Sequence, residues 1–235
     1  MNARATAQVD HLVVAASDLG TGADWCMATL GLPPGPGGRH ALMGTHNRLL
    51  PLASVAHPQA YLEIIAIDPE APGPAPGPDG SPRRRWFDLD DDRVRQSLPQ
   101  RGPHMIHWVC AVPDIEAATA ALARQGIDRG LILDADRPTP NGVLRWRIAV
   151  RPDGQRLFDG LLPTLIEWRS PHPVRSMAPA PLGLRQLSLQ HPQAVRLREA
   201  LDAIGAEAVP VSAGPPALVA HIDAPLGSVV LGSGD

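Results

Sequence analysis

The sequence predicts an α+β fold of tandem βαβββ modules, followed by a third, degenerate βαβββ unit. Three observations predict it. Three stretches of the chain repeat one order of strand and helix patterns, a His and a helix-capping Asp recur seven residues apart in the first two, and a single Gly ends each helix. The predicted parts are a first module at 8–69, a Pro/Gly connector with a short helix at 70–103, a second module at 104–172 and the third unit at 181–235.

The first module begins with an apolar strand in the segment 9–19, where Asp18 is placed to cap a helix. Gly31 ends that helix, because glycine readily adopts the left-handed conformation of a helix C-terminus. Three stretches rich in branched and apolar residues follow and predict strands: RHALMGT, NRLLPLA and AYLEIIAI.

The second module repeats this pattern from residue 105. Asp114 caps its helix and Gly126 ends it, and the predicted strands are GLILDAD, VLRWRIAV and TLIEWRS. The third unit has the strand LRQLSLQHP, a helix that Gly205 ends, and the strands AEAVPVS, ALVAHID and GSVVLGS. This unit lacks the His and Glu that the first two share. We expect it to bind no metal and either to cover an edge of the sheet or to mediate homodimer formation.

Between the modules, residues 71–82 are rich in Pro and Gly, which indicates either a linker or a lid over an active site. The run RRRWFDLDDDRVRQSL that follows predicts a short amphipathic helix through Trp86, Leu89 and Val94.

Composition excludes several classes of protein. The 235 residues are 44% hydrophobic and 19% charged, with a formal net charge of -3, so they offer no cationic surface for nucleic acid. No apolar stretch approaches the roughly 18 residues of a membrane span. Cys26 and Cys110 lie in apolar segments without metal or redox spacing, which indicates buried thiols in a reducing cytoplasm. The GxSxG turn of serine hydrolases and the GK[ST] ending of phosphate-binding loops are both missing.

Acidic and imidazole side chains recur at matching places in the two modules. His11 and His107 stand at the same place in the two first strands, and Glu63 and Glu167 lie in the middle of the two fourth strands. The same residue types at matching places support the tandem repeat.

Together with the segments GGRHALMGTHN (37–47) and YLEIIAIDP (61–69), this pattern resembles the vicinal oxygen chelate superfamily and, within it, the glyoxalase-like domain family. The superfamily includes glyoxalase I, methylmalonyl-CoA epimerase, extradiol dioxygenases and bleomycin-resistance proteins. The resemblance covers about residues 8–172. It implies that paired modules form a cup around a divalent metal held by first and last strands, with His11, Glu63, His107 and Glu167 as ligands.

Two imidazoles and two carboxylates suit Zn, Ni, Fe, Co or Mn, and such an ion could stabilise an enediolate as a Lewis acid. Glu63 or Glu167, displaced by substrate, would then be the catalytic base. The alternative is a metal-free site in which each His bonds to a backbone group and each Glu pairs with Arg.

Strand alternation in VLRWRIAV puts Arg145 and Arg147 on one face. We expect helices to cover the apolar face, so that both Arg side chains enter the cup. There they would bind an anionic substrate or neutralise the carboxylates of a metal-free core. His46 is expected to line the pocket, whereas His172, at a loop edge, is expected at the surface. The predicted substrate-binding residues are Arg145, Arg147, His46 and Asn47.

The predicted function is that of a glyoxalase-like, metal-dependent isomerase or lyase acting on a small anionic carbonyl compound. Two alternatives stay open. An extradiol-type dioxygenase would hold Fe(II) or Mn(II) with two His and one carboxylate, and a fourth ligand in Glu63 counts against it. A bleomycin-resistance type of protein would sequester a small molecule without chemistry and without metal.

Overall fold

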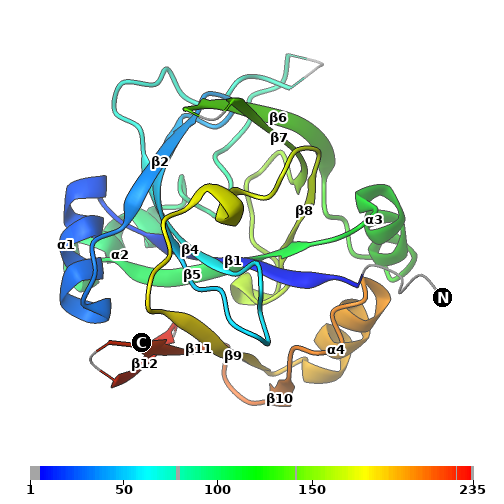
Figure 1. Cartoon of the computed structure of the whole chain (residues 1–235). Helices are drawn as coiled ribbons and strands as arrows, with labels where there is room; N and C mark the ends of the chain where they lie inside the picture. The colour runs from blue at the N-terminus through cyan, green and yellow to red at the C-terminus, as the bar shows by residue number, and fades with distance from the viewer. Residues whose placement is uncertain (1–5, 78–79, 141, 226, 234–235) are drawn as a thin grey trace.

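The computed structural model describes residues 6–77, 80–140, 142–225 and 227–233. These residues form two β-sheets with helices on their outer faces (Figure 1). The larger sheet has eight strands, which come from residues 8–67 and 104–168, and the smaller has four strands from residues 183–232. The predicted α+β class with a cup-shaped mixed sheet is confirmed.

The first module has its capping residues where the sequence predicts them. Asp18 Oδ1 accepts a hydrogen bond from Thr21 N at 2.8 Å, and Gly31 has a φ of 77°. These local interactions begin and end the helix between the first two strands. The elements are β1 (Gln8–Ala15), α1 (Leu19–Leu30), β2 (Gly35–His40), β3 (Thr45–Pro51) and β4 (Tyr61–Ile67).

One strand of this module differs from the prediction. The sequence RHALMGT was expected to form it, but β2 ends at His40 and the following residues, 41–44, form the turn into β3. Gly44 has a φ of 61°, a left-handed conformation that glycine adopts without strain and that a tight turn requires here.

The second module repeats the order of the first. Asp114 Oδ1 accepts from Ala117 N at 2.9 Å and Gly126 has a φ of 70°, so both predicted helix signals are confirmed. The elements are β5 (His104–Ala111), α3 (Ile115–Arg124), β6 (Leu131–Thr139), β7 (Gly142–Val150) and β8 (Thr164–Trp168), with short 3-10 turns at Phe158–Gly160 and Pro173–Ser176.

The order of strands in the large sheet is β2-β3-β4-β1-β5-β8-β7-β6. In each module the first strand pairs with the fourth in parallel, and β1 pairs with β5 in antiparallel to join the modules. The outermost strands, β2 and β6, contact each other. The sheet therefore curls into a nearly closed barrel whose inner face forms the cup (Figure 1).

The two faces of the sheet carry separate apolar cores. The outer core lies under the helices and the third unit and includes Leu12, Ile64 and Trp108. The inner core fills part of the cup and includes Val13, Trp146, Ile148 and the connector residues Trp86 and Leu89. The cup is thus a packed interior rather than an open bowl.

The connector supplies the cap of this interior. Its helix, α2 (Asp92–Arg101), begins later than predicted, so that Trp86 and Leu89 precede it in turns, although both are buried as their apolar character indicates. Of the segment 71–82, residues 78–79 lie outside the described part of the chain, and the remainder contains no helix or strand.

The third unit has the predicted order of elements but a different pairing of strands. In its sheet the order is β10-β9-β11-β12, so the first strand lies between its partners. Its residues join the outer core, and Leu184 N donates to Leu52 O at 2.8 Å. It therefore covers the convex face of the large sheet, and not an edge as one of the two expectations held. The elements are β9 (Gly183–His191), α4 (Ala194–Ala203), β10 (Val211–Ala213), β11 (Ala217–Ala224) and β12 (Gly227–Gly232).

Both cysteines are buried and free, as expected. Within the described ranges, the helices are all too short or too polar to cross a membrane.

Candidate functional site

A β-bulge in β1 turns two neighbouring side chains toward each other. Val9 pairs with Cys110 and His11 pairs with Val109, which leaves Asp10 as the additional residue. His11 Nδ1 lies 2.6 Å from Asp10 Oδ1. The other carboxylate oxygen of Asp10 accepts hydrogen bonds from Trp168 Nε1 at 2.7 Å and from His172 Nε2 at 3.1 Å. The Asp10 carboxylate is therefore fully buried and fully bonded.

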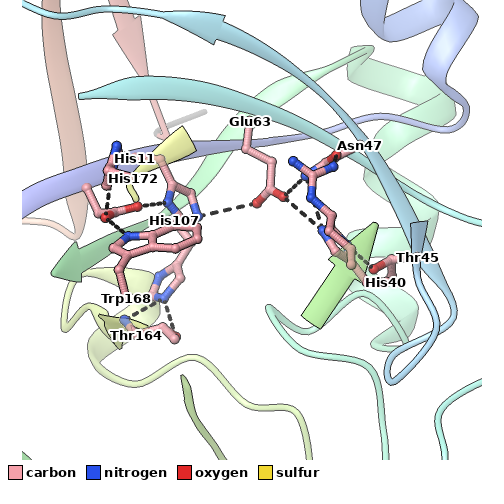
Figure 2. A network of polar contacts seen from close by, with 11 residues as sticks. His11, His40, Thr45, Asn47, Glu63, His107, Thr164, Trp168 and His172 are labelled. Carbon is pink, nitrogen blue, oxygen red and sulfur yellow. Dashed lines mark hydrogen bonds and ion pairs between the residues drawn. The ribbon is translucent and has the colours of Figure 1, made fainter. Parts of the chain in front are cut away.

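Glu63 lies between His11 on one side and Asn47 and His40 on the other (Figure 2). His11 Nε2 is 3.4 Å from Glu63 Oε2, and Asn47 Nδ2 donates to Glu63 Oε1 at 2.6 Å. Asn47 Nδ2 also lies 3.2 Å from His40 Nε2, which accepts from it, and His40 Nδ1 donates to Thr45 Oγ1 at 3.0 Å. Strands β1, β2, β3 and β4 thus hold one continuous polar network.

Burial and charge together set the ionisation of this network. Burial lowers the pKa of His11, but the hydrogen bonds to Asp10 and Glu63 outweigh burial and raise it to about 9. Burial raises the pKa of Glu63, yet the hydrogen bond and charge of His11 lower it overall, and the pKa of Asp10 lies well below its usual value for the same kind of reason. At neutral pH, His11 is therefore a cationic imidazolium between two carboxylates, Asp10 and Glu63. We call these three residues the array.

Aromatic rings enclose the array. The ring of Tyr61 stacks on His11 with centroids 4.6 Å apart, and Trp86 packs edge-on against His40 at 5.1 Å. Burial lowers the pKa of His40 to about 4, so its ring is neutral. A cavity of about 30 Å³ lies between Glu63 and the rings, which is room for about one water molecule.

His107, on β5, forms hydrogen bonds through both ring nitrogens. Nδ1 donates to Gly160 O at 2.7 Å, and Nε2 accepts from Thr164 N at 3.1 Å. Arg129 Nη2 in turn donates to Thr164 Oγ1 at 2.9 Å. Burial holds the pKa of His107 well below its usual value, so the ring is neutral. Its Nδ1 bond is the backbone bond that the metal-free alternative expects.

The expectation that Glu167 shares a site with Glu63 is wrong. Val13 pairs with Glu63 across β1 and β4, and the corresponding pair across β5 and β8 is Val109 with Thr164. Thr164 therefore takes the place of Glu63. Glu167 lies three residues further on, and an odd offset along a strand moves the side chain to the other face of the sheet.

On that outer face, Glu167 has cationic partners, as the metal-free alternative also expects. Its Oε2 accepts from Arg147 Nη2 at 2.7 Å and from Ile115 N, at the start of α3, at 3.0 Å. Arg169 Nη1 lies 2.9 Å from the other oxygen. These bonds account for both oxygens.

Arg145 and Arg147 do not enter the cup. Arg147 also donates to Glu116 of α3 at 2.6 Å, and Arg145 is exposed. The inward face of β7 is the apolar one, with Trp146 and Ile148, because the connector residues fill the cup and need apolar contacts. The assumption that helices cover the apolar face reversed the two faces of this strand.

Of the two predicted residues in β3, Asn47 lies in the site and His46 does not. Asn47 alternates inward with Thr45, which places its amide between Glu63 and His40. His46, one residue away, points to the opposite face.

The four predicted ligands do not fit a metal. His11 and Glu63 are together, but His107 is bonded through both nitrogens and Glu167 lies outside the cup. No set of three or more His, Cys, Asp or Glu side chains in the described part of the chain is placed to hold an ion. The facial triad of a dioxygenase is missing from these residues for the same reason.

Sequence reasoning missed four residues of the site: Asp10, Trp168, His172 and Arg137. Alternation along β1 assigns Asp10 to the outer face, and only the bulge brings it inward. His172 follows a strand and stands beside Pro, which is typical of the surface, but it is buried. Arg137 lies on the inward face of β6, as do Leu133 and Ala135, which stand at alternate positions of the same strand. This alternation could have predicted the position of Arg137 from the sequence.

The fold has the two βαβββ modules that the resemblance implies, which form one sheet with a polar array on its inner face. The chain belongs to the glyoxalase-like domain family, whose model matches residues 9–205. This confirms the resemblance drawn from the sequence. No curated protein sequence matches the chain.

Among solved structures, a hypothetical protein from Staphylococcus aureus is similar at 13% identity and a TM-score of 0.54, over 83% of this chain and 76% of that one. A methylmalonyl-CoA epimerase variant from Streptomyces coelicolor, in complex with 2-nitronate-propionyl-CoA, aligns at 18% identity and a TM-score of 0.43, over 71% and 100% of the two chains. The epimerase from Mycobacterium tuberculosis aligns at 19% identity and a TM-score of 0.38, over 72% and 91%.

Proposed function

We propose that the protein is an isomerase that moves a proton on the carbon beside the carbonyl group of a small anionic compound. One observation carries the proposal: a carboxylate, Glu63, and an imidazolium, His11, meet beside one buried cavity. A base and an acid so placed can act on neighbouring atoms of one substrate.

In the proposed step, the Glu63 carboxylate takes a proton from the carbon next to the carbonyl. The electron pair of that C–H bond forms a carbon–carbon double bond, and the carbonyl π pair moves onto oxygen. His11 donates its Nε2 proton to this oxygen. For the configuration at that carbon to invert, the enol turns over in the site before Glu63 returns its proton to the other face. The carbonyl group re-forms as the O–H proton returns to His11 Nε2.

Asp10 and Asn47 position the two acting groups. Asp10 accepts from His11 Nδ1 and leaves the Nε2 proton on the side of the cavity. Asn47 holds Glu63 Oε1 and leaves Oε2 facing His11. The charge of His11 lowers the pKa of Glu63. As that proton moves to the substrate oxygen, the lowering is relieved, so Glu63 becomes a stronger base during the step in which it acts.

Hydrogen exchange tests this proposal. A panel of 2-oxo acids is incubated with the protein in D₂O, and loss of the proton signal on the carbon beside the carbonyl is followed by NMR. We expect exchange faster than in buffer for at least one acid, and a loss of about 100-fold or more in Glu63→Gln. Glu167→Gln is the matched control and keeps the rate of the parent, because Glu167 lies on the outer face.

A second function, binding without chemistry, is favoured by a cavity of about 460 Å³ that shares Leu49, Arg137 and Pro173 with the polar one and is large enough for a small molecule. In that case ligands bind without exchange above the buffer rate. An exchange rate that is equal in the parent and in Glu63→Gln contradicts the isomerase proposal.

A further inference from the structure

A larger cavity of about 460 Å³ adjoins the polar one. Its volume lies in the range of small-molecule sites. Leu49, Arg137 and Pro173 line both cavities and therefore form the boundary between them. We call the larger cavity the groove. Most of its wall is apolar, with residues from the segment before β2, from β3 and β7, and from the segment after the 3-10 turn at Pro173–Ser176: Leu32, Leu50, Leu144, Met177, Pro179 and Pro181.

Arg137 is the cation at this boundary. Its side chain is 7% exposed, and within the described ranges its guanidinium makes one hydrogen bond, from Nη1 to Asn47 Oδ1 at 3.4 Å. No described carboxylate forms an ion pair with it, although Arg147, Arg151 and Arg156 all have such partners. Arg137 lines both cavities, so its other N–H groups are accessible to an acceptor that enters there.

The surroundings hold Arg137 where it is. Gly38 of β2 lies against the guanidinium, and a Cβ at this position would overlap Nη1. Arg137 thus lies across the contact between β2 and β6, the two outermost strands of the large sheet. Asn47 separates it from Glu63, since the amide oxygen accepts from Arg137 and the amide nitrogen donates to Glu63.

We propose that the groove and Arg137 bind an amphipathic carboxylate, with the carboxylate on the guanidinium and an apolar chain along the groove. One cation with Glu63 nearby suits a monoanion better than a phosphate dianion, and the planar fork of Arg matches a carboxylate. We further infer that such acids are the substrates of the site at Glu63 and carry a carbonyl group that reaches it; this part rests on the proposed function. The binding of a carboxylate by Arg137 does not rest on it.

Straight-chain carboxylates without a reactive carbonyl test the binding. Hexanoate, octanoate and decanoate are titrated into the full chain by calorimetry. We expect the affinity to rise about threefold to fourfold for each methylene that enters the groove. Octan-1-ol and octylamine, which have the same chain length without the negative charge, should bind at least about tenfold more weakly, since a charge-assisted bond is lost.

Two variants locate the carboxylate. Arg137→Gln should weaken octanoate binding at least about tenfold and remove the preference over octan-1-ol. Gly38→Ala leaves Arg137 in the chain but displaces its guanidinium, so this variant should also weaken octanoate binding. Arg145→Gln is the control, since Arg145 is exposed on the outer face, and should bind as the parent does. Thermal unfolding shows that each variant is folded.

Equal affinity for the three acids, or unchanged octanoate binding in folded Arg137→Gln, overturns this inference. The proposed function fails separately. If binding depends on chain length and on Arg137 but hydrogen exchange does not depend on Glu63, the groove proposal is supported and the isomerase proposal is contradicted. If exchange depends on Glu63 but binding does not depend on chain length, the isomerase proposal is supported and the groove proposal is contradicted.

Discussion

Glu63 and Thr164 occupy the same position in the two modules. Each pairs with the residue that lies two positions after the His of the first strand, which is Val13 in the first module and Val109 in the second. Glu63 lies 3.4 Å from His11, and Thr164 bonds to His107. The carboxylate keeps His11 charged, whereas the hydroxyl leaves His107 neutral. The sheet is nearly symmetric, but the charge is confined to the first module, so the protein has one candidate site rather than a pair.

Loss of the charge on His11 should lower the free energy of unfolding as pH rises into the alkaline range. Its pKa is 6.5 when unfolded and about 9 when folded, so its contribution is fully present below pH 6.5 and is lost as pH rises through 9. The difference in unfolding free energy between the parent and His11→Gln should therefore shrink by on the order of 3 kcal/mol between these pH values. Urea denaturation at each pH measures it.

His57→Gln is the control for this experiment. Burial lowers the pKa of His57, so it titrates below 6.5 and should add nothing to the alkaline slope. A difference for His11→Gln that is constant with pH would show that His11 is neutral in the folded protein.

Removal of the Asp10 charge should be costly. Asp10→Asn leaves His11 and His172 without their anionic acceptor in a buried site, and we expect a loss of about 3–5 kcal/mol in stability. The midpoint of the His11 ring signals in an NMR titration should also fall. Asp159→Asn is a matched control, because Asp159 bonds to His191 at 3.0 Å but its side chain is 64% exposed. It should cost less than about 1 kcal/mol.

Arg147→Gln separates the outer face from the cup. Arg147 bonds to Glu167 and Glu116, so its loss should lower the midpoint of thermal unfolding slightly, while octanoate binding and hydrogen exchange stay as in the parent. Calorimetry and thermal unfolding measure the two effects. A loss of ligand binding comparable to that of Arg137→Gln would place Arg147 at the ligand instead.

Helix α1 is packed so closely on the sheet that Gly22 has no room for a methyl group. A Cβ there would overlap Ile64 Cγ2. Gly22→Ala should destabilise by about 1–3 kcal/mol, despite the better helix propensity of Ala. Combined with Ile64→Ala, which alone costs about 2–5 kcal/mol, the effects should be smaller than additive by 1 kcal/mol or more. Additive effects would mean that the two residues are not in contact.

The elements of the fold could be predicted because their signals are local. Asp18, Asp114, Gly31 and Gly126 act within one turn of the helices that they begin or end. Repetition of these signals in two modules then indicated the order of elements and the joined sheet.

The site could be predicted only in part, because it depends on register. His11, Glu63 and Asn47 lie on three adjacent strands of the first module, so their approach follows from the pairing of strands in that module alone. Glu167 follows two strands and a long turn in the second module, and an error of three residues in that count reverses its face. The inward face of β7 depends on Trp86, which comes from the connector between the modules, and no local pattern shows which strand face the connector covers.

The bulge at Asp10 makes the chemistry of the strand sensitive to its length. Deleting that one residue would remove the acceptor of three hydrogen bonds and restore regular pairing between Val9 and its neighbours. Two proteins could then share every other residue of the site and still differ in the charge of the imidazole. An insertion or deletion of one codon in this strand is therefore a larger chemical change than most substitutions around it.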